Sequence, residues 1–330
     1  MGNPLVSVIM PVYNGQQFLQ KSVGSILRQT YQNIEFIAVD DGSDDQSLKL
    51  LEEYKKSMPE HIHMRIISQK NQGICQSRNH ALDLAEGKYI MFIDQDDDME
   101  EDCVQYLCRE IEEQNADMVI GGFNLVDETG AVIEKWLLDP KLAWSKFRIS
   151  APWGRIFRKE IIDQYQIRFM VTKISEDFYF NMLYMSYCQN IFVVSYQGYH
   201  WLYNEKSESR ANMSRLSEER NLLAMLTKLH ADMKKPNILE PEYVEYMVIK
   251  HIIWYLFYVA KKADSDGYRR LYDDCMGWIK DYYPYYQQNV FLKSGKVEGE
   301  NRKIGRVVMV AMFLIKIHLF YPILRVYSKI

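Results

Sequence analysis

Two patterns of apolar and polar positions alternate in the first half of the chain, one typical of strands and one typical of helices. Four short apolar runs, typical of buried strands, cover residues 6–12, 34–40, 64–67 and 89–93. Amphipathic stretches separate these runs. Strands that alternate with helices predict a mostly parallel sheet with helices on both faces, so we expect an α/β fold.

Polar turns follow three of these predicted strands. Tyr13-Asn-Gly15 follows the first, Asp40-Asp-Gly-Ser43 follows the second, and Asp94 to Asp98 follow the fourth. In open α/β sheets, ligands bind beyond the carboxyl ends of the strands. We therefore expect the three turns to share one crevice.

The helical period dominates after residue 212, in long stretches rich in Tyr and Met that include residues 241–261 and 268–282. Such residues most often pack in a core or between copies of a chain, which leaves a homo-oligomer open. We predict three parts, namely a first domain over residues 1–212, a helical domain over 213–300 and a basic, apolar terminal helix over 301–330.

The terminal segment 301–330 carries six Lys or Arg and no acidic residue, around an apolar stretch from Val307 to Leu324. A spanning helix needs about 20 apolar residues with few charges, and Lys316 and His318 interrupt this stretch. The pattern predicts a helix that lies on an anionic membrane surface. The alternative is a terminal helix docked on the protein itself.

Charge and cysteine content narrow the setting of the protein. The net charge of −4 gives no global attraction to nucleic acid, so we expect no nucleic-acid partner. The five cysteines lack C-x-x-C spacing, which argues against a disulfide framework and a zinc site. The first residues lack the charged region of a secretory signal, so a reduced, cytoplasmic setting is expected.

The strongest chemical signal is the stretch 89–98, an apolar strand that runs directly into four carboxylates. Clustered like charges repel unless a cation offsets them. Oxygen ligands on a short turn suit Mg²⁺ or Mn²⁺. An EF-hand loop is excluded because its sixth and twelfth positions would be Met99 and Gln105, and the glycine motifs of P-loop and dinucleotide sites are absent after the first strand. The alternative is a solvated acidic turn.

Five motifs stand in a recognisable order. They are residues 6–14 (VSVIMPVYN), Val39-Asp-Asp-Gly-Ser43, Asn71-Gln-Gly73 with Arg78-Asn79, the Asp94–Asp97 turn with its DxD pattern, and Ser175-Glu-Asp177. This order resembles bacterial family-2 glycosyltransferases over about residues 5–205. The resemblance implies a GT-A fold, a nucleotide-diphosphate sugar as donor and inversion at the anomeric carbon.

The resemblance also implies roles on the donor side. Pro11 and Tyr13 would form a wall for the base, Asp41 would accept a hydrogen bond from a uracil-like N–H, and Arg78 would lie nearby. An aromatic ring, a carboxylate and a guanidinium suit a planar base with donors and acceptors. The alternatives are a Tyr13 packed in the core, an Asp41 that caps the following helix and an Arg78 in a surface ion pair.

The acidic motifs would supply the chemistry. Asp94 matches the family residue that touches the donor ribose or the metal, and Asp96 matches the direct metal ligand, whose cation would stabilise the leaving diphosphate. Asp97 is expected to support the turn. Asp177 matches the catalytic carboxylate, a general base of the kind that contributes about 10² to 10⁴ in rate. Alternatively, Asp177 only stabilises the start of a helix.

The resemblance implies further residues on the acceptor side, namely Trp153, Glu176 and His200, and basic residues near the diphosphate. Trp153 could stack on a sugar or pack in the core, and Glu176 would support the base. His200, with Lys206 and Arg210, could bring positive charge near the diphosphate, in a stretch that could close as a lid.

The predicted activity is transfer of a hexose or N-acetylhexosamine from a UDP-sugar to a hydroxyl of a growing cell-surface glycan. The acceptor would be a lipid-linked polysaccharide precursor, a wall polymer or a glycoprotein, and the enzyme would lie at the inner face of the membrane. The alternative is a catalytically inactive GT-A-like module that recruits partner transferases there, against which the presence of Asp96 and Asp177 argues. A sugar nucleotidyltransferase would need a Gly-rich, basic turn where Tyr13-Asn-Gly15 stands.

Overall fold

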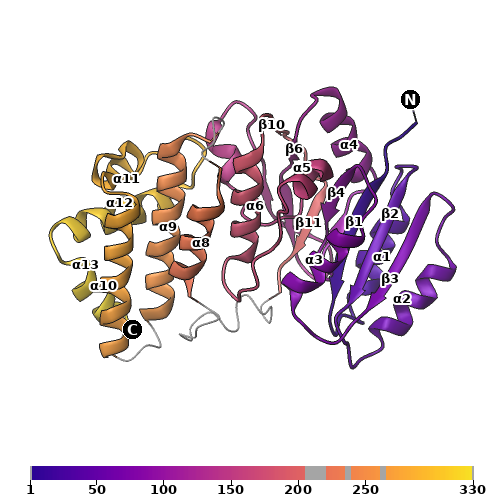
Figure 1. The fold of residues 1–330 in the computed structure, drawn as a ribbon, viewed down its shortest axis with the longest axis horizontal. Coiled ribbons are helices and arrows are strands. Elements are labelled where there is room, and N and C mark those ends of the chain that lie inside the picture. The colour runs from indigo at the N-terminus through magenta and orange to yellow at the C-terminus, as the bar shows by residue number, and fades with distance from the viewer. Residues whose placement is uncertain (1, 205–220, 235–238, 261–264, 329–330) are drawn as a thin grey trace. The chain divides into compact units, whose positions relative to one another are not determined.

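The computed structural model of the chain describes residues 2–204, 221–234, 239–260 and 265–328 (Figure 1). The chain divides into two compact units. The first comprises Met1–Lys141, Ser150–Val171 and Glu176–Asn204, and the second comprises Leu142–Ile149, Thr172–Ser175 and Glu205–Ile330. The boundary therefore lies at residue 204, whereas the predicted boundary at 212 falls outside the described residues.

The first unit is built around a seven-stranded sheet in which only β9 runs antiparallel to its neighbours. The predicted mostly parallel sheet is therefore confirmed. In spatial order the strands are β10 (Ile191–Val193), β6 (Met118–Ile120), β9 (Arg155–Arg158), β4 (Tyr89–Phe92), β1 (Val6–Val12), β2 (Ile34–Asp40) and β3 (Ile62–Ser68).

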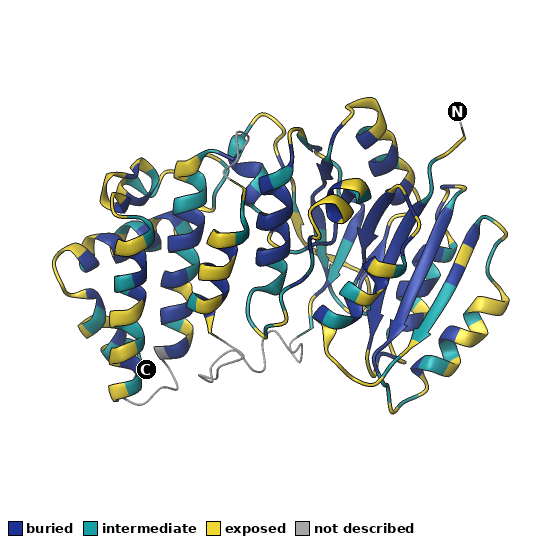
Figure 2. Ribbon diagram, in the orientation of Figure 1, coloured by how far each residue is buried: buried dark blue, intermediate teal, exposed yellow. Residues whose placement is uncertain are grey.

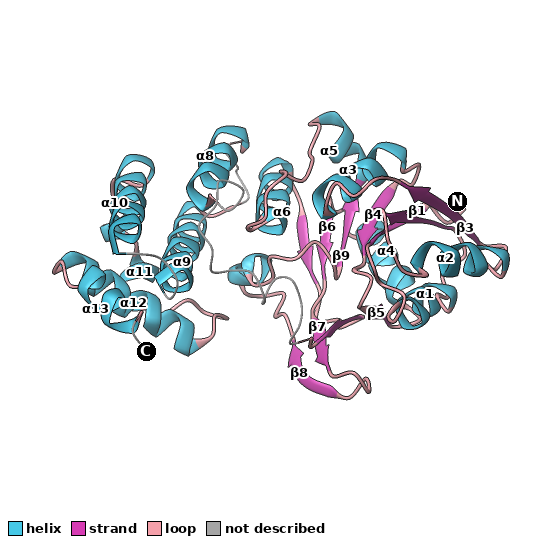
Figure 3. Ribbon diagram, turned by 90° about the horizontal axis from the view of Figure 1, so that it is seen from below, coloured by secondary structure: helices cyan, strands magenta, loops and turns pink. Residues whose placement is uncertain are grey.

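Helices cover both faces of this sheet, as Figure 3 shows. Every residue of β1 and β2 is buried, which explains their unbroken apolar runs (Figure 2). On one face lie α3 (Ile74–Leu84), α5 (Lys159–Gln164) and α6 (Glu176–Tyr187), and on the other lie α1 (Leu19–Leu27), α2 (Ser47–Lys56) and α4 (Cys103–Glu113).

A second, four-stranded sheet extends the first unit, in the order β5 (Asp98–Met99), β11 (Tyr199–Leu202), β7 (Phe123–Val126) and β8 (Val132–Trp136). The antiparallel pairing of β11 with β5 sets His200 opposite Asp98. The acidic turn after β4 is thus held against a strand that lies about a hundred residues later in the sequence.

The second unit is helical in the described residues. Its aromatic core includes Trp144 and Phe147, which pack against Tyr243 and Tyr246 of α9. The helices are η1 (Ala143–Phe147), α8 (Leu222–Asp232), α9 (Pro241–Ala260), α10 (Ser265–Tyr282), η3 (Tyr286–Gln288), α11 (Val290–Ser294), α12 (Arg302–Lys316) and α13 (Phe320–Tyr327).

The single terminal helix predicted over 301–330 is wrong, because α12 and α13 are separate helices. His318 between them has a φ of 60°, a left-handed conformation that ends a helix. Pro322 lies in the first turn of α13, where its missing N–H costs no hydrogen bond. Across the described part of the chain, no helix is both long enough and apolar enough to cross a bilayer.

Candidate active site

Arg78 of α3 joins two of the predicted acidic residues. Its side chain is 1% exposed, its Nη2 donates to Asp94 Oδ1 at 2.7 Å, and its Nη1 donates to Asp177 Oδ1 at 2.7 Å. Asp94 follows β4, and Asp177 is the second residue of α6. A surface ion pair for Arg78 is therefore wrong, because the guanidinium is buried between residues from two distant motifs.

Burial and charge shift the pKa values of this bridge. Burial raises the pKa of the Asp177 carboxyl to about 7, outweighing the attraction of Arg78, and the charges of Glu176 and Asp94 raise it further. Burial alone would lower the pKa of Arg78, but Asp177 and Asp94 outweigh it and raise that pKa. Arg78 therefore stays charged near neutral pH, while Asp177 can accept or release a proton there.

Asp96 differs from its neighbours in having no ion pair or side-chain hydrogen bond within the described ranges. Burial, followed by the charge of Asp94, raises its pKa to about 6. Among the described residues, no Lys, Arg or His side chain therefore neutralises the Asp96 carboxylate.

Asp97 supports the turn, as predicted. Its Oδ2 accepts a hydrogen bond from the Tyr199 hydroxyl at 2.6 Å, and its Oδ1 accepts one from the Leu202 backbone N–H at 2.8 Å. The same hydroxyl accepts a longer hydrogen bond, 3.2 Å, from the Asp94 backbone N–H. Tyr199 escaped the sequence analysis because nothing near it in the chain indicates a partner 102 residues away.

The first polar turn lies beside the acidic turn. The Tyr13 backbone N–H donates to Gln95 Oε1 at 2.8 Å, and Gln95 Nε2 donates to the Tyr13 carbonyl at 3.1 Å. The Tyr13 side chain is 43% exposed, so the core-packing alternative is wrong. Pro11 is buried within β1, paired with Val39. Gln95, the spacer of the DxD pattern, thus links two segments that were both predicted to contact the donor.

Asp41 holds the start of the helix that carries Arg78. Its Oδ1 accepts from the Gln72 N–H at 2.9 Å and from Gln69 Nε2 at 2.7 Å, and its Oδ2 accepts from the Gly73 N–H at 2.7 Å. Gly73 is the N-cap of α3. Asp41 therefore caps α3 rather than the following helix α2, and its Oδ2 can still accept a further bond.

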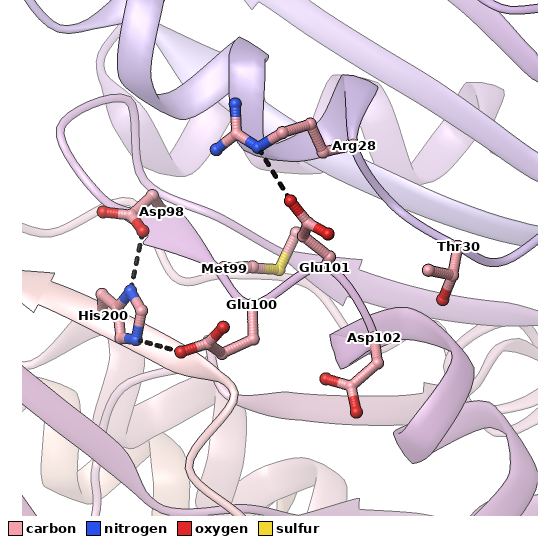
Figure 4. A pocket seen from close by; sticks show the side chains of 8 residues that line it. All are labelled: Arg28, Thr30, Asp98, Met99, Glu100, Glu101, Asp102 and His200. Carbon is pink, nitrogen blue, oxygen red and sulfur yellow. Dashed lines mark hydrogen bonds and ion pairs between the residues drawn. The ribbon is translucent and has the colours of Figure 1, made fainter.

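His200 lies at an acidic hollow (Figure 4). Its Nδ1 is 2.7 Å from Asp98 Oδ1 and its Nε2 is 3.2 Å from Glu100 Oε1, and the hydrogen bond with Asp98 raises the pKa of the imidazole. Lys21 Nζ is 2.8 Å from Asp98 Oδ2. The hollow has a volume of about 510 Å³ and is lined by Arg28, Thr30, Asp98, Met99, Glu100, Glu101, Asp102 and His200. Neither Asp96 nor Asp177 is among these lining residues.

The structure places the other residues predicted on the acceptor side in different surroundings. The Trp153 ring is buried, stacks on Tyr199 with centroids 4.5 Å apart and meets the Phe123 ring edge-on, so the geometry favours core packing. Glu176 is partly buried beside Asp177. Lys206 and Arg210 lie outside the described residues.

Arg155 of β9 also belongs to this region, although the sequence analysis assigned it no role. Burial lowers the pKa of its guanidinium to about 9, and the charge of Asp177 opposes that shift. Arg155 remains protonated at neutral pH, so a second buried cation acts on Asp177. Nothing in the sequence Arg155-Ile-Phe-Arg158 indicates that its first residue is fully buried while its last is not.

A match between this chain and a protein-family model identifies its family. The model described as glycosyl transferase family 2 matches residues 7–173, just over half of the chain. The chain belongs to glycosyl transferase family 2. The resemblance drawn from the five motifs is thereby confirmed.

Curated glycosyltransferases are similar to this chain over different lengths. The glycosyltransferase GlyA of Streptococcus pneumoniae is 30% identical over 53% of this chain and 27% of GlyA, and GlyG of the same species is 39% identical over 38% of this chain and 41% of GlyG. The chain thus spans well under half of the length of either relative. TarP of Staphylococcus aureus, a poly(ribitol-phosphate) β-N-acetylglucosaminyltransferase, is 21% identical over 84% of this chain and 86% of TarP.

Solved structures of similar fold include two sugar-nucleotide complexes. Residues 1–349 of S. aureus TarS with UDP-GlcNAc superpose with a TM-score of 0.72 at 18% identity, covering 98% of this chain and 90% of that one. The mannosyltransferase PcManGT of Pyrobaculum calidifontis, with GDP-Man and Mn²⁺, gives 0.59 at 15% identity, covering 96% and 88%. At these identities the likeness concerns the fold, and it confirms the GT-A architecture of this family-2 member.

Proposed function

We propose that this family-2 chain is an inverting, metal-dependent transferase that moves a hexose or N-acetylhexosamine from a UDP-sugar to a hydroxyl of a growing cell-surface glycan. One observation carries the proposal, namely that the Arg78 guanidinium binds Asp94 and Asp177 together. Asp94 belongs to the DxD turn that would face the donor, and Asp177 would face the acceptor. One buried side chain therefore sets the separation between the two halves of the reaction.

Asp177 would act as the general base. Its carboxylate would take the proton from the acceptor hydroxyl as that oxygen attacks the anomeric carbon, and the bond from that carbon to the diphosphate oxygen would break with its electron pair leaving on UDP. A pKa of about 7 supports this role, because a base works best when its pKa lies near the working pH. Arg78 would orient Asp177 without taking its proton, since a guanidinium donates and cannot accept hydrogen bonds.

Asp96 would hold Mn²⁺ or Mg²⁺. Its carboxylate makes no ion pair or hydrogen bond with another residue in the described part of the chain and its pKa is raised, which fits a site completed by a cation. No group of three His, Cys, Asp or Glu side chains in the described residues is arranged to hold a metal ion by itself. A single carboxylate such as Asp96 suits a hard cation that keeps several waters and takes substrate phosphate oxygens as its other ligands. When bound, the cation would supply charge stabilisation to the leaving diphosphate.

The donor would be bound by the turns after β1 and β2. Tyr13 offers an exposed ring next to the acidic turn, Pro11 fixes the strand behind it, and Asp41 has remaining acceptor capacity for a uracil N–H. The UDP-GlcNAc complex of the similar TarS supports a UDP-sugar as donor. Because the similar PcManGT holds GDP-Man, the experiment must compare UDP-sugars with GDP-sugars.

The acceptor would approach beside Asp177, with Glu176 as its polar contact, while His200 faces Asp98 and Glu100 at the hollow that Asp177 does not line. The name of TarP supports a wall polymer, and a lipid-linked glycan or a glycoprotein fits the same chemistry. Lipid-linked acceptors are held at a membrane, so the proposed activity implies a peripheral position at the inner face of the cell membrane.

The decisive experiment measures nucleotide release across a panel of UDP- and GDP-sugars, with and without EDTA. We expect release from one or more UDP-sugars, its loss in EDTA and its recovery on adding Mn²⁺ or Mg²⁺. Asp96→Ala and Asp177→Asn should each abolish most of it. Asp163→Asn, an exposed carboxylate paired with Lys159, is the matched control and should keep wild-type turnover.

Retained metal-dependent turnover in both Asp96→Ala and Asp177→Asn would remove the proposed mechanism. Tight binding of a UDP-sugar without turnover by the wild-type chain, for any acceptor offered, would instead favour the inactive GT-A-like module that recruits partner transferases.

A further inference from the structure

The helix α12 turns an apolar stripe to solvent. Val310, Phe313 and Ile317 recur at intervals of three and four residues, which places them on one side of the helix, and all three are exposed. Phe313 is the largest of them and is 59% exposed. A large ring left in water at the centre of an apolar stripe indicates a surface that has a partner.

The next helix, α13, repeats the arrangement. Leu319, Ile323 and Val326 follow the same three-and-four spacing and are exposed, and Val326 is 63% exposed. Two consecutive helices of the second unit therefore each present an apolar stripe.

These stripes are distinct from the faces that hold the helices on the second unit. Val308, Ala311 and Ile315 of α12 are buried, and so are Phe320 and Leu324 of α13. The Phe320 ring meets Phe257 of α9 edge-on, with centroids 5.8 Å apart. The docked-helix alternative is thus correct for the inner faces, and the outer stripes are additional to what docking needs.

The charge carried by α12 and α13 themselves is of one sign. Arg302, Lys303, Arg306 and Lys316 are all exposed, and residues 301–330 contain no acidic residue. A second copy of this surface would bring like charges together, whereas an anionic surface would be attracted to it. Apolar stripes bordered by cations are the pattern of helices that lie in the boundary between headgroups and acyl chains.

We propose that α12 and α13 form a membrane-docking surface for anionic phospholipid. The stripe residues enter the acyl boundary while Arg302, Lys303, Arg306 and Lys316 contact lipid phosphates. The inference deepens the peripheral position implied by the proposed function. Its test needs no turnover, so the failure of either can be recognised without the other.

The test is flotation of the full chain with vesicles of phosphatidylcholine alone and with about a third phosphatidylglycerol. We expect binding to the anionic vesicles, at least about tenfold weaker binding to neutral ones, and strong weakening in 0.5 M salt, since headgroup attraction is screened. Phe313→Gln with Val326→Gln should weaken binding about tenfold, because both side chains lose their favourable transfer from water.

Matched variants distinguish a specific surface from general damage. Ile133→Gln with Val290→Gln removes two equally exposed apolar side chains elsewhere and should bind like wild type. Arg306→Gln with Lys316→Gln should weaken anionic binding only, and Lys49→Gln with Lys55→Gln, two exposed lysines of α2, should not.

Three results would overturn the proposal. They are no binding of wild type to anionic vesicles, equal binding to neutral ones, and equal losses in the stripe variant and its control. Light scattering tests whether a second copy of the chain binds this surface instead. If the molar mass changes in the Phe313→Gln, Val326→Gln variant while its vesicle binding does not, the surface belongs to a contact between copies of the chain. UDP release to a soluble acceptor should stay at the wild-type rate in all four double variants.

Discussion

Tyr199 and Asp97 meet across 102 residues of sequence, where the phenol hydroxyl donates to the buried carboxylate at 2.6 Å. The same oxygen accepts from the Asp94 backbone N–H, so one side chain binds both ends of the acidic turn. A phenol has one proton to donate, and here it goes to Asp97 Oδ2. The position of the turn therefore depends on β11 as much as on β4.

Tyr199→Phe should loosen the acidic turn while keeping the ring stacked on Trp153. We expect the free energy of unfolding to fall by about 1–3 kcal/mol, because a buried carboxylate loses its donor, and the donor KM to rise more than kcat falls. Urea unfolding and donor titrations measure the two effects. Tyr285→Phe, at a highly exposed ring, is the control and should change neither. An unchanged donor KM in Tyr199→Phe would contradict a positioning role.

Arg78→Ala should be among the most destabilising changes in the chain. It leaves Asp94 and Asp177 without their shared cation, and breaking a buried pair costs about 3–5 kcal/mol. Arg168→Ala, which removes a partly exposed pair with Asp83, should cost about 1 kcal/mol or less. Arg78→Lys offers a folded alternative, because it keeps the charge but cannot donate along two fixed directions. Similar unfolding midpoints for the Arg78→Ala and Arg168→Ala variants would exclude the buried bridge.

Asp177→Asn should lower kcat by about 10² to 10⁴ and leave the donor KM nearly unchanged, since it removes a general base but little volume. Steady-state kinetics with a saturating acceptor measures both constants. Glu176→Gln is the neighbouring control and should lower kcat far less. Equal losses in the two variants would move the base away from Asp177.

The pH dependence should follow the ionisation of Asp177. A base must be deprotonated to act, so with a pKa of about 7 the value of kcat/KM should fall tenfold per pH unit below about 7 and level off above it. Glu176 raises the pKa of Asp177, so Glu176→Gln should move this limb to lower pH. A limb that stays in place in Glu176→Gln would assign the ionisation to another group.

The sequence predicts those parts of the site that are encoded locally. The Asp94–Asp98 turn follows an apolar run, and parallel strands bring their carboxyl ends to one edge, so the convergence of the turns after β1, β2 and β4 could be expected. The order of these strands confirms it. Asp97 is also expected to support the turn, and its hydrogen bonds with Tyr199 and the Leu202 N–H agree with that role.

The rest depends on contacts that leave no local trace. Arg78 and Asp177 lie 99 residues apart, and nothing in either motif indicates that the arginine is buried. Asp41 has the sequence of a cap for the next helix but caps α3, because β3 brings that later helix to it. A tryptophan such as Trp153 can stack on a sugar ring, and only the fold reveals that the Tyr199 ring covers its face.

The chain passes between its two units more than once, since residues 142–149 and 172–175 belong with the helical unit. Trp144 and Phe147 therefore find their neighbouring rings on α9, about a hundred residues later. A protein cut after residue 204 would keep these two large aromatic side chains and lose the α9 rings that pack against them. Such a fragment would be prone to aggregate, so a single cut should not yield the first unit as a well-behaved protein.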